Sequence, residues 1–209
     1  MDIHTYIHTW ALKVYHRITR GNYGTDVWRQ KFKYFGKDAT ISWPSILTFG
    51  EGTISIGDKS VVKPNSRIEN FSNRLNAEIA IKIGDRCDFG YYFTILNASK
   101  VTIGNDVLIA SHVLITSENH GIDPESLYPY KEQPLTISSV SIGDGCWIGE
   151  KVCILPGVHI GKQCIIGAGS IVTKSIPDYS IAVGNPAKVI KKYNFSTHKW
   201  ENVNNNEKK

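Results

Sequence analysis

The chain lacks a long hydrophobic run. None of its apolar stretches reaches the roughly 18 residues that a membrane-spanning helix needs. Residues 1–20 carry charges and histidines at positions where a signal peptide would need an apolar stretch. We therefore expect a cytoplasmic protein.

The chain also lacks paired cysteines. None of its four cysteines belongs to a C-x-x-C pair, the spacing typical of redox and zinc sites. Cys87, Cys146 and Cys164 each lie two residues before a hydrophobic residue, where a small buried side chain fits. We expect reduced, packed thiols and no metal site.

A six-residue hydrophobic period is the strongest pattern in the sequence. A period of six is neither the 3.6 of a helix nor the alternation of a simple strand, and it is typical of a hexapeptide β-helix. Its members are Ile56, Val62 and Ile68; Ile83, Phe89 and Ile95; Ile103, Ile109 and Ile115; and Ile142, Ile148, Ile154, Ile160, Ile166 and Val172. Glycine follows four of the positions in the last group. These groups predict an all-β solenoid of about five coils over residues 41–184.

Three hexapeptides make one triangular coil, so residues 18 apart should stack at the ~4.8 Å spacing of neighbouring strands. Ile142 should therefore lie against Ile160, and Ile148 against Ile166. The period fails at residues 69–78, slips between Ile95 and Ile103, and fails again at the proline-containing residues 117–139. We expect residues 117–139 to leave the solenoid as an excursion loop, and residues 185–209 to form a short C-terminal extension and polar tail.

The N-terminal segment 1–40 differs from the rest of the chain in charge. The net charge is +5, and residues 1–37 hold seven Lys or Arg against two Asp. Apolar residues of 3–18 follow helical spacing, which predicts an amphipathic helix. We expect this helix to pack on the solenoid. Peripheral contact with the inner face of an anionic membrane is the alternative. No nucleic-acid-binding motif accompanies the charge.

His120 is the candidate catalytic residue. It lies in the excursion loop soon after Ile115, and a histidine is the usual general base near neutral pH. We assign ordinary structural roles to His112 and His159 at presumed coil corners.

Residues Val101 to Lys192 resemble the hexapeptide-repeat acetyltransferases of the left-handed β-helix fold. The motifs that carry the resemblance are VTIGNDVLIASHVLIT, ENHGI, IGDGCWIGEKVCILPGVHIG, IGAGSIVTKSIP and VGNPAKVIKKY. The O-acetyltransferases of bacterial surface-polysaccharide and lipopolysaccharide assembly are the most similar group. Galactoside and maltose acetyltransferases are more distant.

This resemblance implies a mechanism and a cofactor. The catalytic histidine of the family falls on His120, where it would deprotonate an acceptor hydroxyl that attacks acetyl-CoA directly in a ternary complex. It also implies a homotrimer, since flat-faced prisms pack readily about a threefold axis. The coenzyme A contacts of relatives fall on Trp147, Glu150, Ala168, Thr173, Lys174, Lys188 and Lys191.

The acceptor side departs from the family pattern. Two polar contacts of the galactoside enzymes fall on Gly90 and Ala98, which offer no side-chain hydrogen bond, so a free galactoside is a doubtful acceptor. Tyr91, Tyr92 and Asn97 are candidate substrate-binding residues instead.

The group that orients His120 stays open in the sequence. A backbone carbonyl, Glu118 or Asp123 would each accept a hydrogen bond from the imidazole.

The function expected from the sequence is acetyl-CoA-dependent O-acetylation of a sugar hydroxyl in a surface polysaccharide or its precursor. An N-acetyltransferase for an amino-sugar nucleotide and an antibiotic acetyltransferase are alternatives within the fold. Zinc hydratases of the same fold need three histidines with a long-then-short spacing, whereas His112, His120 and His159 run short then long. A purely structural solenoid would leave the loop histidine without a purpose.

Overall fold

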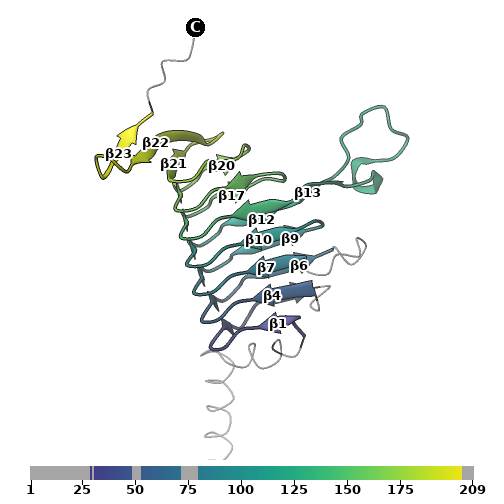
Figure 1. Ribbon diagram of the computed structural model, residues 1–209. Coiled ribbons are helices and arrows are strands. Elements are labelled where there is room, and N and C mark those ends of the chain that lie inside the picture. The colour runs from purple at the N-terminus through teal and green to yellow at the C-terminus, as the bar shows by residue number, and fades with distance from the viewer. Residues whose placement is uncertain (1–28, 30, 49–52, 72–79, 204–209) are drawn as a thin grey trace, which may run out of the picture.

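The computed structural model describes residues 29, 31–48, 53–71 and 80–203, which form a three-sided parallel β-helix (Figure 1). Sheet A contains β1 (Tyr34–Phe35), β4 (Ile54–Ile56), β7 (Ile81–Ile83), β10 (Val101–Ile103), β15 (Val140–Ile142) and β18 (His159–Ile160). Sheet B contains β2 (Thr40–Ile41), β5 (Val61–Val62), β8 (Asp88–Phe89), β11 (Leu108–Ile109), β16 (Trp147–Ile148), β19 (Ile165–Ile166), β21 (Ser180–Val183), β22 (Lys188–Asn194) and β23 (Lys199–Asn202). Sheet C contains β3 (Ile46–Thr48), β6 (Arg67–Asn70), β9 (Thr94–Asn97), β12 (Leu114–Thr116), β17 (Cys153–Ile154) and β20 (Ile171–Val172).

The expected stacking of residues 18 apart is confirmed. Ile142 pairs with Ile160 in sheet A, and Ile148 pairs with Ile166 in sheet B. The number of coils is larger than expected, because sheets A and C each contain six strands rather than about five. The additional coil is built from β1, β2 and β3, so residues 34 and 35 of the N-terminal segment 1–40 form a strand of the solenoid, which was expected to begin at residue 41. The predicted helix 3–18 lies outside the described residues.

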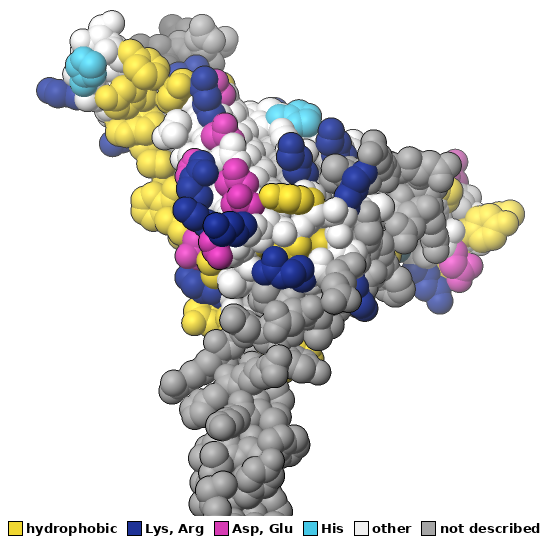
Figure 2. Space-filling model, turned by 60° about the horizontal axis from the view of Figure 1, so that its bottom comes forward, with side chains coloured by type: hydrophobic (Ala, Val, Ile, Leu, Met, Phe, Trp, Pro, Cys, Tyr) yellow, Lys and Arg dark blue, Asp and Glu magenta, His cyan; other side chains and the backbone are white. Residues whose placement is uncertain are grey.

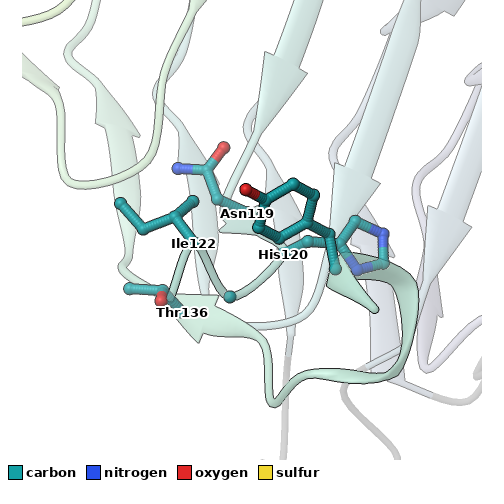
Figure 3. A pocket seen from close by; sticks show the side chains of 6 residues that line it. Asn119, His120, Ile122 and Thr136 are labelled. Atoms are coloured by element: carbon teal, nitrogen blue, oxygen red, sulfur yellow. The ribbon is translucent and has the colours of Figure 1, made fainter. Parts of the chain in front are cut away.

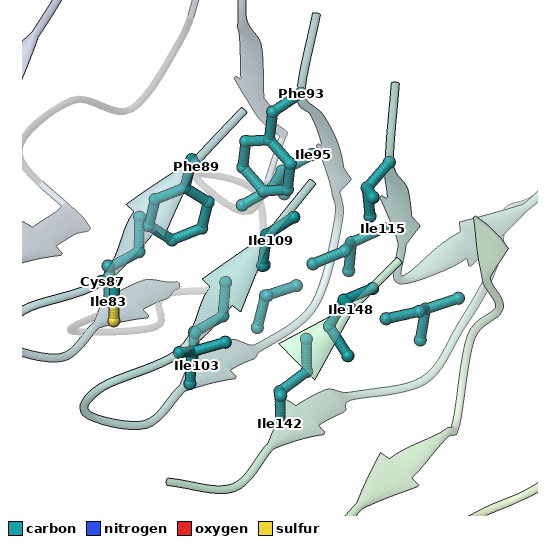
Figure 4. Packing of buried hydrophobic residues seen from close by; sticks show 14 of the residues in the cluster. Ile83, Cys87, Phe89, Phe93, Ile95, Ile103, Ile109, Ile115, Ile142 and Ile148 are labelled. Atoms are coloured by element: carbon teal, nitrogen blue, oxygen red, sulfur yellow. The ribbon is translucent and has the colours of Figure 1, made fainter. Parts of the chain in front are cut away.

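The hydrophobic core is a narrow column inside the three sheets (Figure 4). Ile95, Ile109 and Ile148 are at most 1% exposed. Burying each such side chain stabilises the fold by about 1.5–3 kcal/mol relative to leaving it in water. Phe89 and Phe93 fill one level of the column, with ring centroids 4.7 Å apart. The predicted packing of Cys87, Cys146 and Cys164 in the core is also confirmed, since all three are buried.

A ladder of side chains fixes the stacking of coils at the corner between sheets A and B. The Oδ1 of Asp85 accepts the Asp58 N–H at 2.8 Å, and the Oδ1 of Asn105 accepts the Asp85 N–H at 2.9 Å. The coils approach closely here. A Cβ on Gly84 would lie 2.5 Å from the Gly104 carbonyl oxygen. The glycines that follow the hydrophobic positions are therefore required by this contact between coils.

Charged side chains bridge successive coils on the outside. Lys63 pairs with Asp88 at 3.0 Å, and Arg86 pairs with Asp106 at 2.6 Å. Figure 2 shows basic and acidic side chains interspersed on this view of the molecule. Such exposed pairs contribute little to stability, typically about 0–1 kcal/mol each.

The excursion loop, residues 117–139, leaves the prism after β12 and projects away from the coils (Figure 1). It contains β13 (Glu118–Asn119), the 3-10 helix η3 (Tyr130–Glu132) and β14 (Thr136–Ile137), and β13 and β14 pair in antiparallel fashion. The chain returns to sheet A at β15.

The C-terminal extension forms more regular structure than the sequence indicated. Strands β21, β22 and β23 continue sheet B as an antiparallel ribbon. Tyr179, Tyr193, Phe195 and Trp200 pack edge to face along this ribbon. Within the described part of the chain, no helix has the length and apolar character needed to cross a membrane.

Candidate active site

His120 directly follows β13 and its side chain is exposed to solvent. It borders a depression of about 490 Å³ in the excursion loop. The residues that line this depression are Asn119, His120, Gly121, Ile122, Tyr130 and Thr136, and Figure 3 shows how four of them surround it. An exposed imidazole beside an open cavity of this size can exchange protons with a bound hydroxyl group.

A buried glutamine braces the loop around His120. The Nε2 of Gln133 donates to the carbonyl oxygens of Asp123 at 2.9 Å and Tyr128 at 3.1 Å. Its Oε1 accepts the Asp123 N–H at 3.0 Å, and the residue is 7% exposed. Gly121 allows this contact, because a Cβ there would lie 2.6 Å from the Gln133 side chain. The loop therefore has an internal framework that does not depend on the coils.

The two acidic candidates for orienting His120 differ in their surroundings. The carboxylate of Asp123 already accepts the Glu125 N–H at 2.9 Å. Glu118 has a buried Oε2 with no hydrogen-bond partner among the described residues. Burial raises the pKa of the Glu118 carboxyl above its ordinary value, the charge of His120 opposes this shift, and the charge of Glu69 adds to it. Glu118 is thus the acidic candidate whose charge interacts with that of His120.

The residues expected to contact coenzyme A fall into two groups. Trp147 lies on the outer surface of sheet B and is 52% exposed. Glu150 and Ala168 lie at the corner between sheets B and C, and Lys188 and Lys191 lie on β22. Thr173 and Lys174 instead follow β20, at the corner between sheets C and A. Within a single chain, the group on sheet B and the group after β20 therefore lie on different sides of the prism.

The expected substrate-binding residues do not gather around His120 either. Tyr91 and Tyr92 are about half exposed at the corner between sheets B and C, where Tyr92 stacks on His112 at a centroid distance of 4.8 Å. Asn97 is fully buried, donates to the Asn70 side chain at 2.8 Å and accepts from the Ser117 hydroxyl at 2.8 Å. The interpretation of Asn97 as an exposed polar contact is wrong, because this ladder holds its amide inside the prism.

Three residues beside His120 were not identified in the sequence, namely Asn119, Tyr130 and Thr136. Asn119 and Thr136 come together only through the pairing of β13 with β14, which the six-residue period does not encode. His159 was expected at a corner but lies in β18, where its Nδ1 is 2.9 Å from the Ser141 hydroxyl. The described residues contain no cluster of three or more His, Cys, Asp or Glu side chains suited to a metal ion.

Comparison with known proteins identifies the family. The family model for the bacterial transferase hexapeptide (six repeats) matches residues 139–174. WbbJ of Escherichia coli (strain K12), named as an O-acetyl transferase of lipopolysaccharide biosynthesis, is 39% identical over 157 residues, which is 72% of this chain and 78% of WbbJ. The galactoside O-acetyltransferase of the same organism is 36% identical over 140 residues, which is 67% of this chain and 64% of that protein.

Two solved structures share the fold. AntD, an N-acyltransferase from Bacillus cereus in complex with dTDP and 3-hydroxybutyryl-CoA, has a TM-score of 0.70 at 21% identity, covering 83% of this chain and 89% of AntD. A maltose O-acetyltransferase from Clostridium difficile 630 has a TM-score of 0.55 at 32% identity, covering 80% of this chain and 73% of that one.

Stacked coils that match the hexapeptide-transferase family model are typical of a hexapeptide-repeat transferase. Because the chain is 39% identical to WbbJ over 78% of that protein, it belongs to the hexapeptide-repeat acetyltransferase family and is an acyltransferase.

Proposed function

We propose that the protein is an acetyl-CoA-dependent O-acetyltransferase that modifies a sugar hydroxyl in a surface polysaccharide or its precursor. The observation that carries this proposal is the position of His120 at the rim of an open depression in the excursion loop. The identity to WbbJ over most of its length supports the same class of acceptor.

The chemistry requires one base and no covalent enzyme intermediate. Neutral His120 takes the proton from the acceptor hydroxyl while the hydroxyl oxygen attacks the thioester carbonyl carbon. The C–S bond then breaks, the acetyl group stays on the acceptor oxygen, and the coenzyme A thiolate takes the proton back from the imidazolium. Glu118 is the carboxyl that we assign to positioning His120 and stabilising its charged form.

The residues available for acetyl-CoA fit its chemistry. Lys188 and Lys191 on β22 and Lys174 after β20 are cations suited to the phosphate groups. Trp147 offers an exposed indole to the pantetheine arm. Glu150 already has a hydrogen-bond partner within the fold, because its carboxylate accepts the Ser111 N–H at 3.1 Å.

The outer faces of the prism support a homotrimer. The outward column of sheet B contains Leu108, Trp147 and Ile165 in register. The outward column of sheet C contains Leu114, Cys153 and Ile171, whereas that of sheet A contains Lys82, Thr102 and Ser141.

The columns become polar in the earlier coils, where Asp88 continues that of sheet B and Thr94 and Arg67 continue that of sheet C. The apolar parts of sheets B and C fit an assembly in which sheet B of one copy meets sheet C of the next. Such packing would bring Thr173 and Lys174 of one copy toward the sheet B group of another. Each site would then draw residues from two chains.

The proposal is tested with His120→Ala. Loss of a general base should lower the rate of acetyl transfer by about 10²–10⁴-fold, while calorimetry should show unchanged affinity for acetyl-CoA. Near-normal turnover in this variant would remove His120 from the mechanism.

An N-acyltransferase is the second candidate, because AntD is named as an enzyme of that activity and shares the fold. Mass spectrometry of products formed from matched hydroxyl and amino sugars separates the two. Acetylation confined to the amine would replace the leading proposal.

A further inference from the structure

We infer that Asn97 is a positioning residue for His120, because through the Ser117 hydroxyl it fixes the point at which the excursion loop leaves the coils. This inference rests on the proposed function, in which His120 is the base, and it adds a residue of the coils that places this base. Asn97 ends β9, and Ser117 directly follows β12. Both side chains are fully buried.

The Ser117 hydroxyl makes every hydrogen bond that a hydroxyl group can make. It donates to the Oδ1 of Asn97 at 2.8 Å. Its oxygen accepts the N–H groups of Ala98 at 3.0 Å and Ser99 at 3.1 Å. A hydroxyl has one proton to donate and two lone pairs that accept. The first residue of the loop is therefore tied at three points to the preceding coil.

The amide of Asn97 is itself held in one orientation. Its Nδ2 donates to the Oδ1 of Asn70 at 2.8 Å, which directs its own Oδ1 toward Ser117. The Nδ2 of Asn70 donates in turn to the Thr53 hydroxyl oxygen. The donors of this ladder all point away from the loop, and hydrogen bonds aligned in one direction polarise one another. The Ser117 hydroxyl thus meets an acceptor whose position is set by the coils.

The ladder ends at the residue where the loop begins. On the coil that follows the loop, Ile154 pairs with Ile115. The residue of that coil that corresponds to Ser117 is Pro156, whose side chain has no hydrogen-bonding group. Polar side chains that served only to stack coils would be expected on both sides of the loop.

The base of the loop transmits this attachment to His120. The Ser138 N–H donates to the Ser117 carbonyl oxygen at 3.0 Å, so the outgoing and returning chains are joined beside the ladder. From there β13 and β14 pair as one ribbon, and His120 directly follows β13 (Figure 1). Gln133 braces the rest of the loop internally. A shift at Ser117 would therefore move the loop as a unit and displace the imidazole relative to the coils.

The first measurement compares the steady-state kinetics of Asn97→Ala and Asn70→Ala. Asn97→Ala removes the acceptor of the Ser117 hydroxyl, whereas Asn70→Ala removes an equally buried amide one coil away and leaves that acceptor in place. Asn97→Ala should lower kcat about 10- to 100-fold, since a misplaced catalytic group is costly. The KM for acetyl-CoA should stay constant, because its proposed contacts lie on the coils. Asn70→Ala should keep kcat near the wild-type value although both variants lose stability. Equal kcat in the two variants would overturn the inference.

The second measurement breaks the same contact from the other side. Ser117→Ala removes the hydroxyl and should reproduce the loss of kcat, so the inference can be tested even where Asn97→Ala does not fold. Ser117→Thr keeps a hydroxyl at this position and should retain most of kcat. A loss in Ser117→Thr as large as that in Ser117→Ala would contradict a role for the hydroxyl.

A double variant shows whether Asn97 acts through His120. In His120→Ala the base is absent, so adding Asn97→Ala should cause no further fall in the residual rate. A further fall as large as that in the wild-type background would mean that Asn97 acts on another part of the site, and the inference would fail.

The same variants separate this inference from the proposed function. Normal turnover in Asn97→Ala, together with loss of turnover in His120→Ala, would overturn the inference and leave the proposed function intact. Near-normal turnover in His120→Ala would instead remove the assigned base, and the role of Asn97 would fall with it.

Discussion

In the coils, Ile109 and Ile148 are at most 1% exposed, whereas in the excursion loop Ile122 is 84% exposed and Leu127 is 98% exposed. Large aliphatic side chains are thus buried in the coils and exposed in the excursion loop. The coils use hydrophobic burial to stack strands in fixed register. The loop uses one buried polar residue, Gln133, to hold its backbone and leaves its large side chains at the surface. The coils thus supply stability, and the proposed function assigns recognition to the loop, as in many enzymes whose sites lie on loops of a rigid scaffold.

The largest effect on the free energy of unfolding should come from a substitution in the coils. Ile148→Ala removes a fully buried side chain from the central column, and it should lower the free energy of unfolding by about 2–5 kcal/mol. Leu127→Ala at the loop surface should change it by less than about 0.5 kcal/mol. Urea denaturation followed by circular dichroism measures both. A loss in Leu127→Ala comparable to that in Ile148→Ala would contradict the division between the regions.

A substitution in the framework of the loop should affect stability less and should act mainly on the rate of acetyl transfer. Gln133→Ala removes three hydrogen bonds that join Asp123 and Tyr128 across the loop, so the residues around His120 should lose their fixed geometry. We expect acetyl transfer to fall about 10- to 100-fold, since misplaced catalytic groups are costly, with the unfolding midpoint nearly unchanged.

The control for that change is Gln163→Ala, which alters an exposed glutamine on the coils. Hydrogen exchange should show faster exchange confined to residues 117–139 in Gln133→Ala only. A fall in global stability equal to that of Ile148→Ala would mean that the loop is part of the core.

The contrast between regions also explains what the sequence could predict. The period that includes Ile142 and Ile160 identifies the coils because each inward position must be hydrophobic and each coil repeats the last. The additional coil was missed because the period is interrupted between Leu47 and Ile56. In the loop no repeat exists. His120 was proposed from its chemical type and from the family resemblance, and it stays a proposal. Tyr130 was not proposed, since only the folded loop brings it to the same depression as His120.

Asn97 shows the limit of prediction inside the coils. Its position beside two tyrosines suggested a surface residue, yet the structure places its amide in a buried ladder with Asn70 and Ser117. A polar residue in a strand of known register can still point inward when a buried polar side chain is there to form a hydrogen bond with it. The periodicity of hydrophobic residues carries no information about such partners.

The smallest effect on stability should come from a substitution of Glu118, which follows β12 at the junction of the coils and the excursion loop. Because burial raises the pKa of its carboxyl in the folded protein, the folded state holds the proton more tightly than the unfolded state. Stability from this group is therefore fully present at low pH and is lost as the pH rises from the ordinary carboxyl range through the raised pKa. Glu118→Gln removes this loss, so the variant should be more stable than the wild type at pH 7 and nearly equal to it at pH 4. The gain should stay below about 1 kcal/mol, because the side chain is only partly buried and solvent screens its charge. Thermal unfolding at both pH values measures it, with the exposed Glu125→Gln as the control. A variant that is less stable than wild type at pH 7 would show that the charged carboxylate makes a favourable contact in the folded protein, and Glu118 would then belong to the framework of the coils.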